Sequence, residues 1–384
     1  MRYALVTETY PPEVNGVALT VQGLANGLHA RGHEVEVVRP RQPRDPGAAS
    51  DAEGIRTRLV RGAALPRYPG LRFGLPATRQ LARHWAREAP DAIYVATEGP
   101  LGWSALRAAS RLGIPVASGF HTRFDQYMRD YGMPWLEGTA LAWMRRFHNR
   151  ADATLVPTRE LMEFLQARGF ERVVRLARAV DTGLLSPALR DESLRAAWGA
   201  QPGTLVAIHV GRIAPEKNLD LAVRAFRAIQ QQRPDARFVW VGDGPARAAL
   251  AQANPDFVFC GVQRGPELAR HFASGDLFLF PSRSETFGNV TLEAMASGVP
   301  TVAFDSGAAR EHLQDGVHGA LATDERGFVA AAMRLAGDDE ALRARGRAAR
   351  AAVMRLRPEQ VAADFDSLLA GLARRRERHA GLAA

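Results

Sequence analysis

Two carboxylates, Glu285 and Glu293, lie eight residues apart in the segment 281–300. From Val290 onward the apolar spacing predicts a helix that ends at the Gly-Val-Pro sequence 298–300. Glu285 therefore precedes the helix, and Glu293 lies in its first turns. The start of a helix offers free backbone N–H groups and a positive dipole end, which suit a phosphate, and two glutamates beside it suit the hydroxyl groups of a nucleotide-sugar. Alternatively, a glutamate near a helix start only stabilises the helix dipole, by about 0.3–1 kcal/mol.

Two cations, Arg212 and Lys217, follow an expected strand, 204–210, and precede an expected helix, 219–232. Lys217 is the only lysine of the chain, which also contains 49 arginines. Arginine offers a planar fork and lysine a mobile point charge, and this pair suits a diphosphate. We therefore expect the loop to bind the diphosphate of the nucleotide-sugar, although cations in surface loops usually have no such role.

Two residues of the first half also lie where ligands bind in α/β proteins. Gly16 precedes an expected helix, 17–31, and would let a ligand approach the backbone closely. His121 follows an expected strand, 115–118, and the carboxyl ends of strands are where open α/β sheets bind ligands. An ordinary loop glycine and a histidine without function are the alternatives.

Strands and helices alternate along nearly the whole chain and position these residues. The alternation predicts an α/β protein of two doubly wound domains, at residues 1–180 and 181–358. A length of 384 residues suits two cores. The single cysteine, Cys260, excludes an intramolecular disulfide and fits a reducing compartment.

The net charge of +9 is partly concentrated in residues 56–87, which contain eight arginines and no acidic residue. These arginines, with aromatic residues interleaved, favour an anionic partner, membrane lipid before nucleic acid, and a solvated basic face is the alternative. The residues assigned to this membrane or acceptor contact are Arg67, Tyr68, Arg72, Arg79, Arg83, Trp85 and Arg87. No apolar run is long enough to span a bilayer and no signal peptide is evident. We therefore expect a cytoplasmic protein, peripheral on the inner face of the cell membrane.

The segment 281–300, the loop from Arg212 to Lys217 and the N-terminal loop resemble the retaining GT-B glycosyltransferases of family four. The resemblance covers nearly the full chain. The sequences YPGLRFGLP and TRFDQYMRDYG resemble members that glycosylate lipids, namely mannosyltransferases, sulfoquinovosyl-lipid synthases and glucosyl-diacylglycerol synthases. Many members carry two glycines where this chain has Asn15-Gly16, so only Gly16 is carried over.

The resemblance implies two Rossmann-like domains that face each other across a cleft, with a last helix, about 359–384, that returns to the first domain. It also implies sugar transfer with retention at the anomeric carbon and without a metal or other cofactor. Arg212 and Lys217 would stabilise the leaving diphosphate. Glu285 and His121 would contact the donor sugar, and Glu293 the ribose. The other implied donor contacts are Gly16, Val262, Phe287, Gly288, Asn289 and Val290.

We therefore predict an enzyme that moves a hexose from a nucleotide-sugar to a lipid or lipid-linked acceptor. The donor that we expect first is GDP-mannose, which supplies mannose. The alternatives are a UDP-sugar-dependent transferase, a sugar-nucleotide epimerase, a pyridoxal-phosphate phosphorylase that uses Lys217, and a basic nucleic-acid-binding protein. No Ser-His-Asp constellation is evident. Asp364 and Asp366 have the spacing of a metal motif, but we expect both on a helix surface. The acceptor, the linkage and the oligomeric state stay open.

Overall fold

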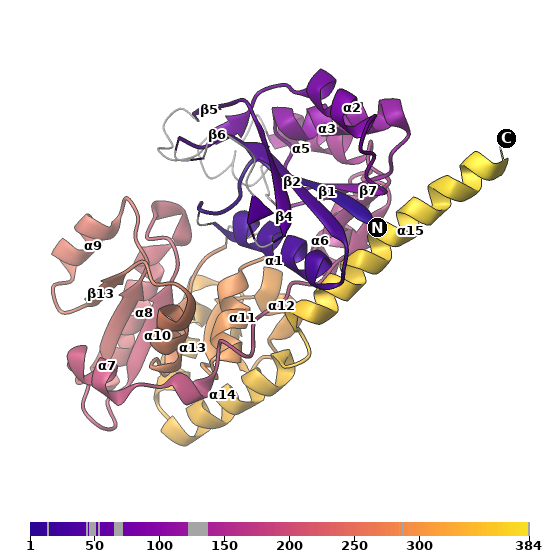
Figure 1. Ribbon diagram of the computed structural model, residues 1–384. Coiled ribbons are helices and arrows are strands. Elements are labelled where there is room, and N and C mark those ends of the chain that lie inside the picture. Colours follow the sequence, from indigo (N-terminus) through magenta and orange to yellow (C-terminus); the bar gives the residue numbers. More distant parts are fainter. Residues whose placement is uncertain are drawn as a thin grey trace. The chain divides into compact units, whose positions relative to one another are not determined.

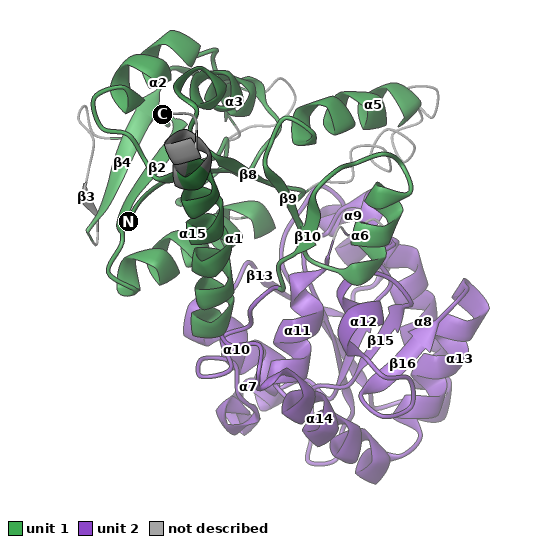
Figure 2. Cartoon of the chain, turned by 90° about the vertical axis from the view of Figure 1, so that its right-hand side faces the viewer, with its two compact units in different colours: residues 1–177, 358–384 green, residues 178–357 purple. Residues whose placement is uncertain are grey.

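The structure is a computed structural model, which describes residues 1–13, 15–43, 45, 51–52, 54–64, 72–121, 137–283, 285 and 287–382. The chain forms two compact units (Figure 2). Unit 1 comprises residues 1–177 and 358–384, and unit 2 comprises residues 178–357. The first boundary lies after residue 177, three residues before the expected one, and the second lies after residue 357, one residue before the expected one.

Unit 1 is built on an eight-stranded sheet in the order β10-β9-β8-β7-β1-β2-β4-β3. Figure 1 labels β1, β2, β4 and β7 of this sheet. Neighbouring strands are parallel, except for β3 and β4. The strands are β1 Arg2–Val6, β2 Glu34–Pro40, β3 Asp51–Ala52, β4 Ile55–Val60, β7 Ala92–Val95, β8 Val116–Gly119, β9 Ala153–Val156 and β10 Val173–Arg175. A separate antiparallel hairpin consists of β5 Gly62–Ala64 and β6 Arg72–Gly74.

The helices of unit 1 cover both faces of this sheet. They are α1 Gly16–Ala30, α2 Thr78–Trp85, α3 Pro100–Leu112, α5 Glu137–His148, α6 Arg159–Gln166 and α15 Pro358–Leu382. Because side chains alternate along a strand, Ala4 and Val6 of β1 pack with α2, α3 and α5, whereas Tyr3 faces α15. In α1, the N-cap Asn15 accepts hydrogen bonds from the backbone of Val17 and Ala18, which fixes where the helix begins.

Asp366 anchors the last helix, α15, to the first sheet. Its carboxylate accepts hydrogen bonds from Tyr3 Oη and Arg31 Nε, both at 3.0 Å, and lies 2.9 Å from His33 Nε2. Burial opposes ionisation, but these contacts prevail and hold the pKa of Asp366 below its usual value. The expectation that Asp364 and Asp366 both lie on a helix surface is wrong for Asp366, because that carboxylate faces the sheet and is 9% exposed.

Unit 2 contains a six-stranded, all-parallel sheet in the order β13-β12-β11-β14-β15-β16. The strands are β11 Val206–Val210, β12 Arg237–Val241, β13 Val258–Gly261, β14 Leu277–Phe280, β15 Thr301–Phe304 and β16 Gly319–Ala322. The helices are α7 Glu192–Ala197, α8 Leu219–Gln232, α9 Arg247–Ala253, α10 Gly265–Ala273, α11 Asn289–Ala296, α12 Gly307–His312, α13 Glu325–Ala336 and α14 Asp339–Val353. Apolar clusters bury both faces of the sheet, which explains why its central strands are mostly apolar.

The strand order of unit 2 reverses between β11 and β14, which are hydrogen-bonded neighbours. From β11 the chain builds outward to β13, then returns to β14 and builds in the other direction. Ligands of such sheets bind beyond the carboxyl ends of the strands at this reversal. No helix in the described part of the chain combines the length and apolar character needed to cross a membrane.

Candidate functional site

The predicted cation loop follows β11, and the predicted glutamate segment follows β14. The two segments therefore start from neighbouring strand ends at the reversal of strand order. The cation loop contains a short 3₁₀ turn, Pro215–Lys217, and Asn218 then adopts the left-handed conformation that begins α8. Asn218 Nδ2 donates to the carbonyl of Pro281 at 3.4 Å, which ties the two segments together.

Lys217 and Glu285 form an ion pair in this place. Lys217 Nζ lies 2.5 Å from Glu285 Oε1, and Ser282 Oγ donates to the same oxygen at 3.1 Å. The two charged side chains are 19% and 26% exposed, so a ligand can reach both. The structure thus brings together a cation and a carboxylate that are 68 residues apart in the sequence.

Arg212, the other predicted cation, pairs with Glu216 at 3.3 Å and is 49% exposed. The Glu216 side chain is only 16% exposed, so water reaches this pair mainly at the guanidinium. The half-exposed guanidinium is accessible to an anionic ligand.

Helix α11 begins without a side-chain cap. Its N-cap is Gly288, whose φ of +88° is a conformation that residues with a side chain rarely adopt. No acidic residue lies in the first turn, which begins at Asn289 and Val290. The preceding residue, Phe287, is 6% exposed, and its carbonyl accepts from the Ala308 N–H at 2.7 Å, which holds the loop in place. The first N–H groups of α11 are thus available to an anion.

Glu293 lies on the second turn of α11 and is partly buried. No group in the described part of the chain forms a hydrogen bond or an ion pair with its carboxylate. Burial therefore raises the pKa of this carboxyl to about 7. Val262, which follows β13, is 52% exposed.

Sequence reasoning missed His209, which lies inside β11 beneath these residues. The ring is 1% exposed and packs against Trp240 at 4.6 Å between centroids, with 40° between the ring planes. Burial, together with the nearby Lys217 ammonium, lowers its pKa to about 4 although a hydrogen bond to the Leu279 carbonyl opposes the shift. His209 is therefore neutral at pH 7 and adds no third positive charge to the pair of cations. The signal in the sequence is a histidine within the apolar run VAIHV.

Unit 1 holds the two predicted residues of the first half. Gly16 is the first residue of α1, next to the N-cap Asn15. His121 lies two residues after β8 and is partly buried. Its Nε2 is 2.7 Å from the hydroxyl of Tyr94, which lies on the adjacent strand β7.

Residues 14–184 match the family model described as Glycosyltransferase Family 4, and residues 204–338 match the model of Glycosyl transferases group 1. A GDP-mannose-dependent alpha-mannosyltransferase of Mycolicibacterium smegmatis is 39% identical over 313 residues, which cover 81% of each chain. The chain belongs to glycosyltransferase family 4. This membership confirms the prediction of a glycosyltransferase.

An alpha-monoglucosyldiacylglycerol synthase of Streptococcus pneumoniae is 26% identical over 347 residues, which cover 86% of this chain and 77% of that one. Among solved structures, the sucrose-phosphate synthase of Thermosynechococcus elongatus has a TM-score of 0.81, with 97% of this chain and 98% of that chain covered at 19% identity. That likeness concerns the fold. The predicted GT-B class, with two Rossmann-like halves, is confirmed.

In this glycosyltransferase the structure reveals a Ser-His-Glu arrangement that the sequence analysis did not detect. Ser118 Oγ lies 2.9 Å from His148 Nδ1, and His148 Nε2 lies 3.2 Å from Glu98 Oε1. All three side chains are at most 4% exposed, so no substrate reaches the serine. The arrangement joins α5 to the ends of β7 and β8 and has a structural role.

The basic stretch of the glycosyltransferase differs from the expectation at Trp85. This side chain is 1% exposed, so its assignment to a membrane contact is wrong. Leu81 and Trp85, four residues apart, form the apolar face of α2 and pack in the core, because a helix on a sheet buries its apolar stripe. Arg72 donates to the Gly62 carbonyl at 2.6 Å within the hairpin. Arg67 and Tyr68 lie outside the described residues.

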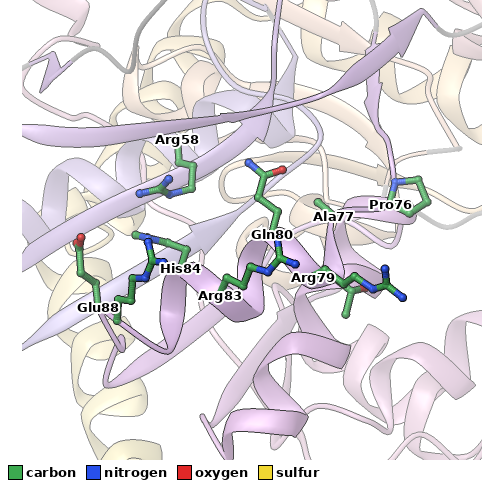
Figure 3. Close-up of a pocket in the computed structure, with 10 residues that line it drawn as sticks. Arg58, Pro76, Ala77, Arg79, Gln80, Arg83, His84 and Glu88 are labelled. Atoms are coloured by element: carbon green, nitrogen blue, oxygen red, sulfur yellow. The ribbon is translucent and has the colours of Figure 1, made fainter.

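Arg79, Arg83 and Arg87 lie on the opposite side of α2 and in the turn after it, and all three are exposed. Within the described residues they form no ion pair. They line an open hollow of about 930 Å³ between α2 and β4, which Arg58 borders from the strand (Figure 3). We call this feature the arginine hollow. Arg58 and His84 both contact the buried carboxylate of Glu36, at 2.8 and 3.0 Å, and Glu88, which also lines the hollow, pairs with Arg56 at 3.0 Å. The excess positive charge therefore comes from the three arginines of α2 and the turn after it.

No group of three His, Cys, Asp or Glu side chains gathers in a geometry that suits a metal, among the residues that the structure describes. The independence from a metal or other cofactor stays a prediction.

Proposed function

We propose that this glycosyltransferase moves mannose from GDP-mannose to a lipid or lipid-linked acceptor, with retention at the anomeric carbon. The pairing of Lys217 with Glu285 at the ends of β11 and β14 carries the proposal. A cation for the diphosphate and a carboxylate for the sugar hydroxyls lie side by side there. The mycobacterial mannosyltransferase supports the donor, and the diacylglycerol-glucosylating relative supports a lipid acceptor.

Donor binding would exchange the partners of this ion pair. The diphosphate would lie at the start of α11, where Lys217 Nζ and the Arg212 guanidinium would turn from Glu285 and Glu216 to its oxygens. The released Glu285 carboxylate would then accept hydrogen bonds from the sugar hydroxyls. Glu293 would bind the ribose, and His121 would contact the sugar.

In the transfer step, the acceptor hydroxyl would form a bond to the anomeric carbon while the bond from that carbon to the diphosphate oxygen breaks. Attack on the face that the diphosphate leaves retains the configuration, and the departing phosphate oxygen takes the acceptor's proton. Negative charge grows on the diphosphate in the transition state, so cations placed beforehand lower the barrier. Because Lys217 and Arg212 supply that charge, we propose that no metal or other cofactor takes part.

The test is the thermal stability of the purified protein with GDP, UDP and ADP, without added metal. A ligand at about a hundred times its Kd adds about 2.7 kcal/mol to the unfolding free energy. We expect GDP to raise the Tm most. A rise in Tm with UDP alone would indicate that the donor is a UDP-sugar rather than GDP-mannose. No change in Tm with any of the three diphosphates would overturn the proposed site. Conversion of the nucleotide-sugar without an acceptor would instead identify an epimerase.

The raised pKa of Glu293 makes nucleotide binding depend on pH. Only the ionised carboxylate accepts hydrogen bonds from both ribose hydroxyls, so we expect affinity to rise as the pH passes upward through about 7. The ionised fraction differs about tenfold between about pH 6 and about pH 8, so the Kd of GDP falls by up to that factor. Calorimetric titration measures it. Glu293→Gln is the control that separates this effect from ionisation of the nucleotide, and an equal pH dependence of both proteins would contradict the assignment.

We also propose that the enzyme binds the inner face of the cell membrane through the arginine hollow. Arg79 and Arg83 project from one side of α2, and Arg87 lies in the turn after it. Each cation near an anionic surface contributes about 1 kcal/mol, so the triple change to glutamine weakens binding to phosphatidylglycerol vesicles about a hundredfold. Flotation with vesicles measures this.

The matched control is the triple glutamine variant of Arg334, Arg343 and Arg347. These arginines are exposed on α13 and α14 of unit 2, and their removal lowers the net charge equally. We expect this control to float like the wild type. Equal losses in both triple variants would contradict a docking surface at α2, and indifference of the wild type to anionic lipid would overturn the membrane proposal.

A further inference from the structure

Tyr94 and His121 form a hydrogen bond within unit 1, with 2.7 Å between the tyrosine hydroxyl and His121 Nε2. The rings meet edge to face at 6.4 Å between centroids. We infer that Tyr94 is a positioning residue: its hydroxyl holds the imidazole of His121 in the orientation in which that ring meets the donor sugar. The inference rests on the proposed role of His121.

The protein around Tyr94 holds its hydroxyl in one place. The side chain is 1% exposed and belongs to β7, which pairs in parallel with β8 through Tyr94 and Ala117. Phe365 of α15 packs against the tyrosine ring at 5.1 Å with an angle of 80° between the planes, and is itself fully buried. A strand and a helix that lie far apart in the sequence therefore fix the ring, and its hydroxyl is the part that reaches His121.

The backbone between the two residues leaves room for this contact. A Cβ on Gly119, the last residue of β8, would lie 2.1 Å from the Tyr94 hydroxyl and 2.5 Å from His121 Nε2. Any side chain at this position would thus occupy the place of the hydrogen bond. The absence of a side chain at residue 119 is a requirement of the contact between Tyr94 and His121.

The hydrogen bond restricts rotation of a partly buried histidine that is proposed to touch substrate. A side chain held in its productive orientation loses less entropy in the transition state. One neutral hydrogen bond corresponds to a factor of up to about ten in rate. The factor is independent of which residue donates, since either tautomer of the imidazole can form the bond.

The experiment is a double-mutant cycle of Tyr94→Phe and His121→Ala in the full chain, with kcat and KM measured for GDP-mannose and a membrane lipid acceptor. Phenylalanine keeps the ring and its contact with Phe365 but removes the hydroxyl. We expect kcat to fall up to about tenfold in Tyr94→Phe, with KM for the donor changed less than about twofold. In the His121→Ala background, Tyr94→Phe should cause no further loss. Equal losses in both backgrounds would overturn the inference.

Tyr3→Phe is the matched control. Tyr3 is fully buried on β1, and its hydroxyl donates to Asp366 of α15 without contacting His121. This variant loses a buried tyrosine hydrogen bond to the same helix, so we expect a lower Tm with kcat within about twofold of the wild type. If kcat of Tyr3→Phe fell as much as that of Tyr94→Phe, lower stability would explain both losses. That result would overturn the positioning role of Tyr94.

A second measurement separates this inference from the proposed function. The imidazole nitrogen resonances of His121, assigned by their loss in His121→Ala, should shift in Tyr94→Phe and stay in place in Tyr3→Phe. If the wild type transfers no sugar, the proposed function fails, and the resonances still decide whether Tyr94 holds His121. Unchanged resonances in Tyr94→Phe would overturn the inference.

Discussion

Replacement of Lys217 by glutamine lowers kcat about 100- to 1,000-fold, the loss expected when one preorganised charge opposite a developing anion is removed. The ammonium lies next to Glu285, at the end of β11, and is proposed to bind the leaving diphosphate. Both partners are partly exposed, so water solvates the glutamate that remains and the Tm changes little. Lys217→Arg keeps the charge but not its compact form, and we expect an intermediate rate.

Steady-state kinetics with saturating donor measure this loss, and thermal unfolding checks that the variant is folded. Arg224→Gln is the matched control, because Arg224 is a cation of the same unit that pairs with a glutamate, Glu325, on an exposed surface. We expect its rate to equal that of the wild type. A Lys217→Gln variant that retains transfer within about threefold would contradict the role of the ammonium in the transition state.

The single lysine also permits a direct test of where the nucleotide binds. Acylation of the intact protein modifies Lys217 and the N-terminal amine as its two primary amines, and mass spectrometry distinguishes the two peptides. A nucleoside diphosphate that occupies the site should protect Lys217 and leave the N-terminal amine reactive. Equal modification of both amines with and without the ligand would contradict binding at Lys217.

Asp276→Ala lowers the unfolding free energy of unit 2 by about 3–5 kcal/mol, the cost of removing the less exposed of the two partners of a buried charge. Arg195 then keeps Glu192, at 3.3 Å, whose side chain is 68% exposed. Arg195 is 3% exposed, and its Nη1 lies 2.9 Å from Asp276 Oδ2. The same guanidinium donates to the carbonyls of Ser274 and Thr204, and Asp276 also accepts from the Val206 N–H at 2.8 Å. The pair therefore joins α7 to the beginnings of β11 and β14, the strands that position the site.

Urea or thermal unfolding measures the change. Asp256→Ala is the control, because Asp256 pairs with Arg227 at the surface, where the two side chains are 46% and 38% exposed. Hydrogen bonds from Arg227 hold the pKa of Asp256 at about 2, but water screens this exposed pair and we expect a loss below about 1 kcal/mol. Equal destabilisation by both changes would contradict a special cost of the buried pair.

In the basic stretch, residues 56–87, amino-acid composition alone gives a wrong estimate of the surface charge. Arg56 and Arg58 belong to β4, whose alternation of arginines with Ile55 and Thr57 is typical of a strand with one polar face. Their charges are balanced by glutamates from other parts of the chain: Arg56 contacts Glu34 and Glu88, and Arg58 contacts Glu36. The absence of acidic residues from this stretch therefore says little about the charge of the surface. Among the described residues assigned to a contact with an anionic surface, the arginines of α2 and the following turn are exposed and form no ion pair.

The sequence by itself determined the alternation of strands and helices, the family, and the loops that carry Arg212, Lys217 and Glu285. These features are local, because apolar periodicity and the residues after a strand end lie within a few positions of one another. Only the tertiary structure decided that Lys217 contacts Glu285, that Asp366 is an anchor and Trp85 a core residue, and that Tyr94 reaches His121. Such contacts depend on which strands are neighbours and which helix face is buried, and the packing of distant segments sets both.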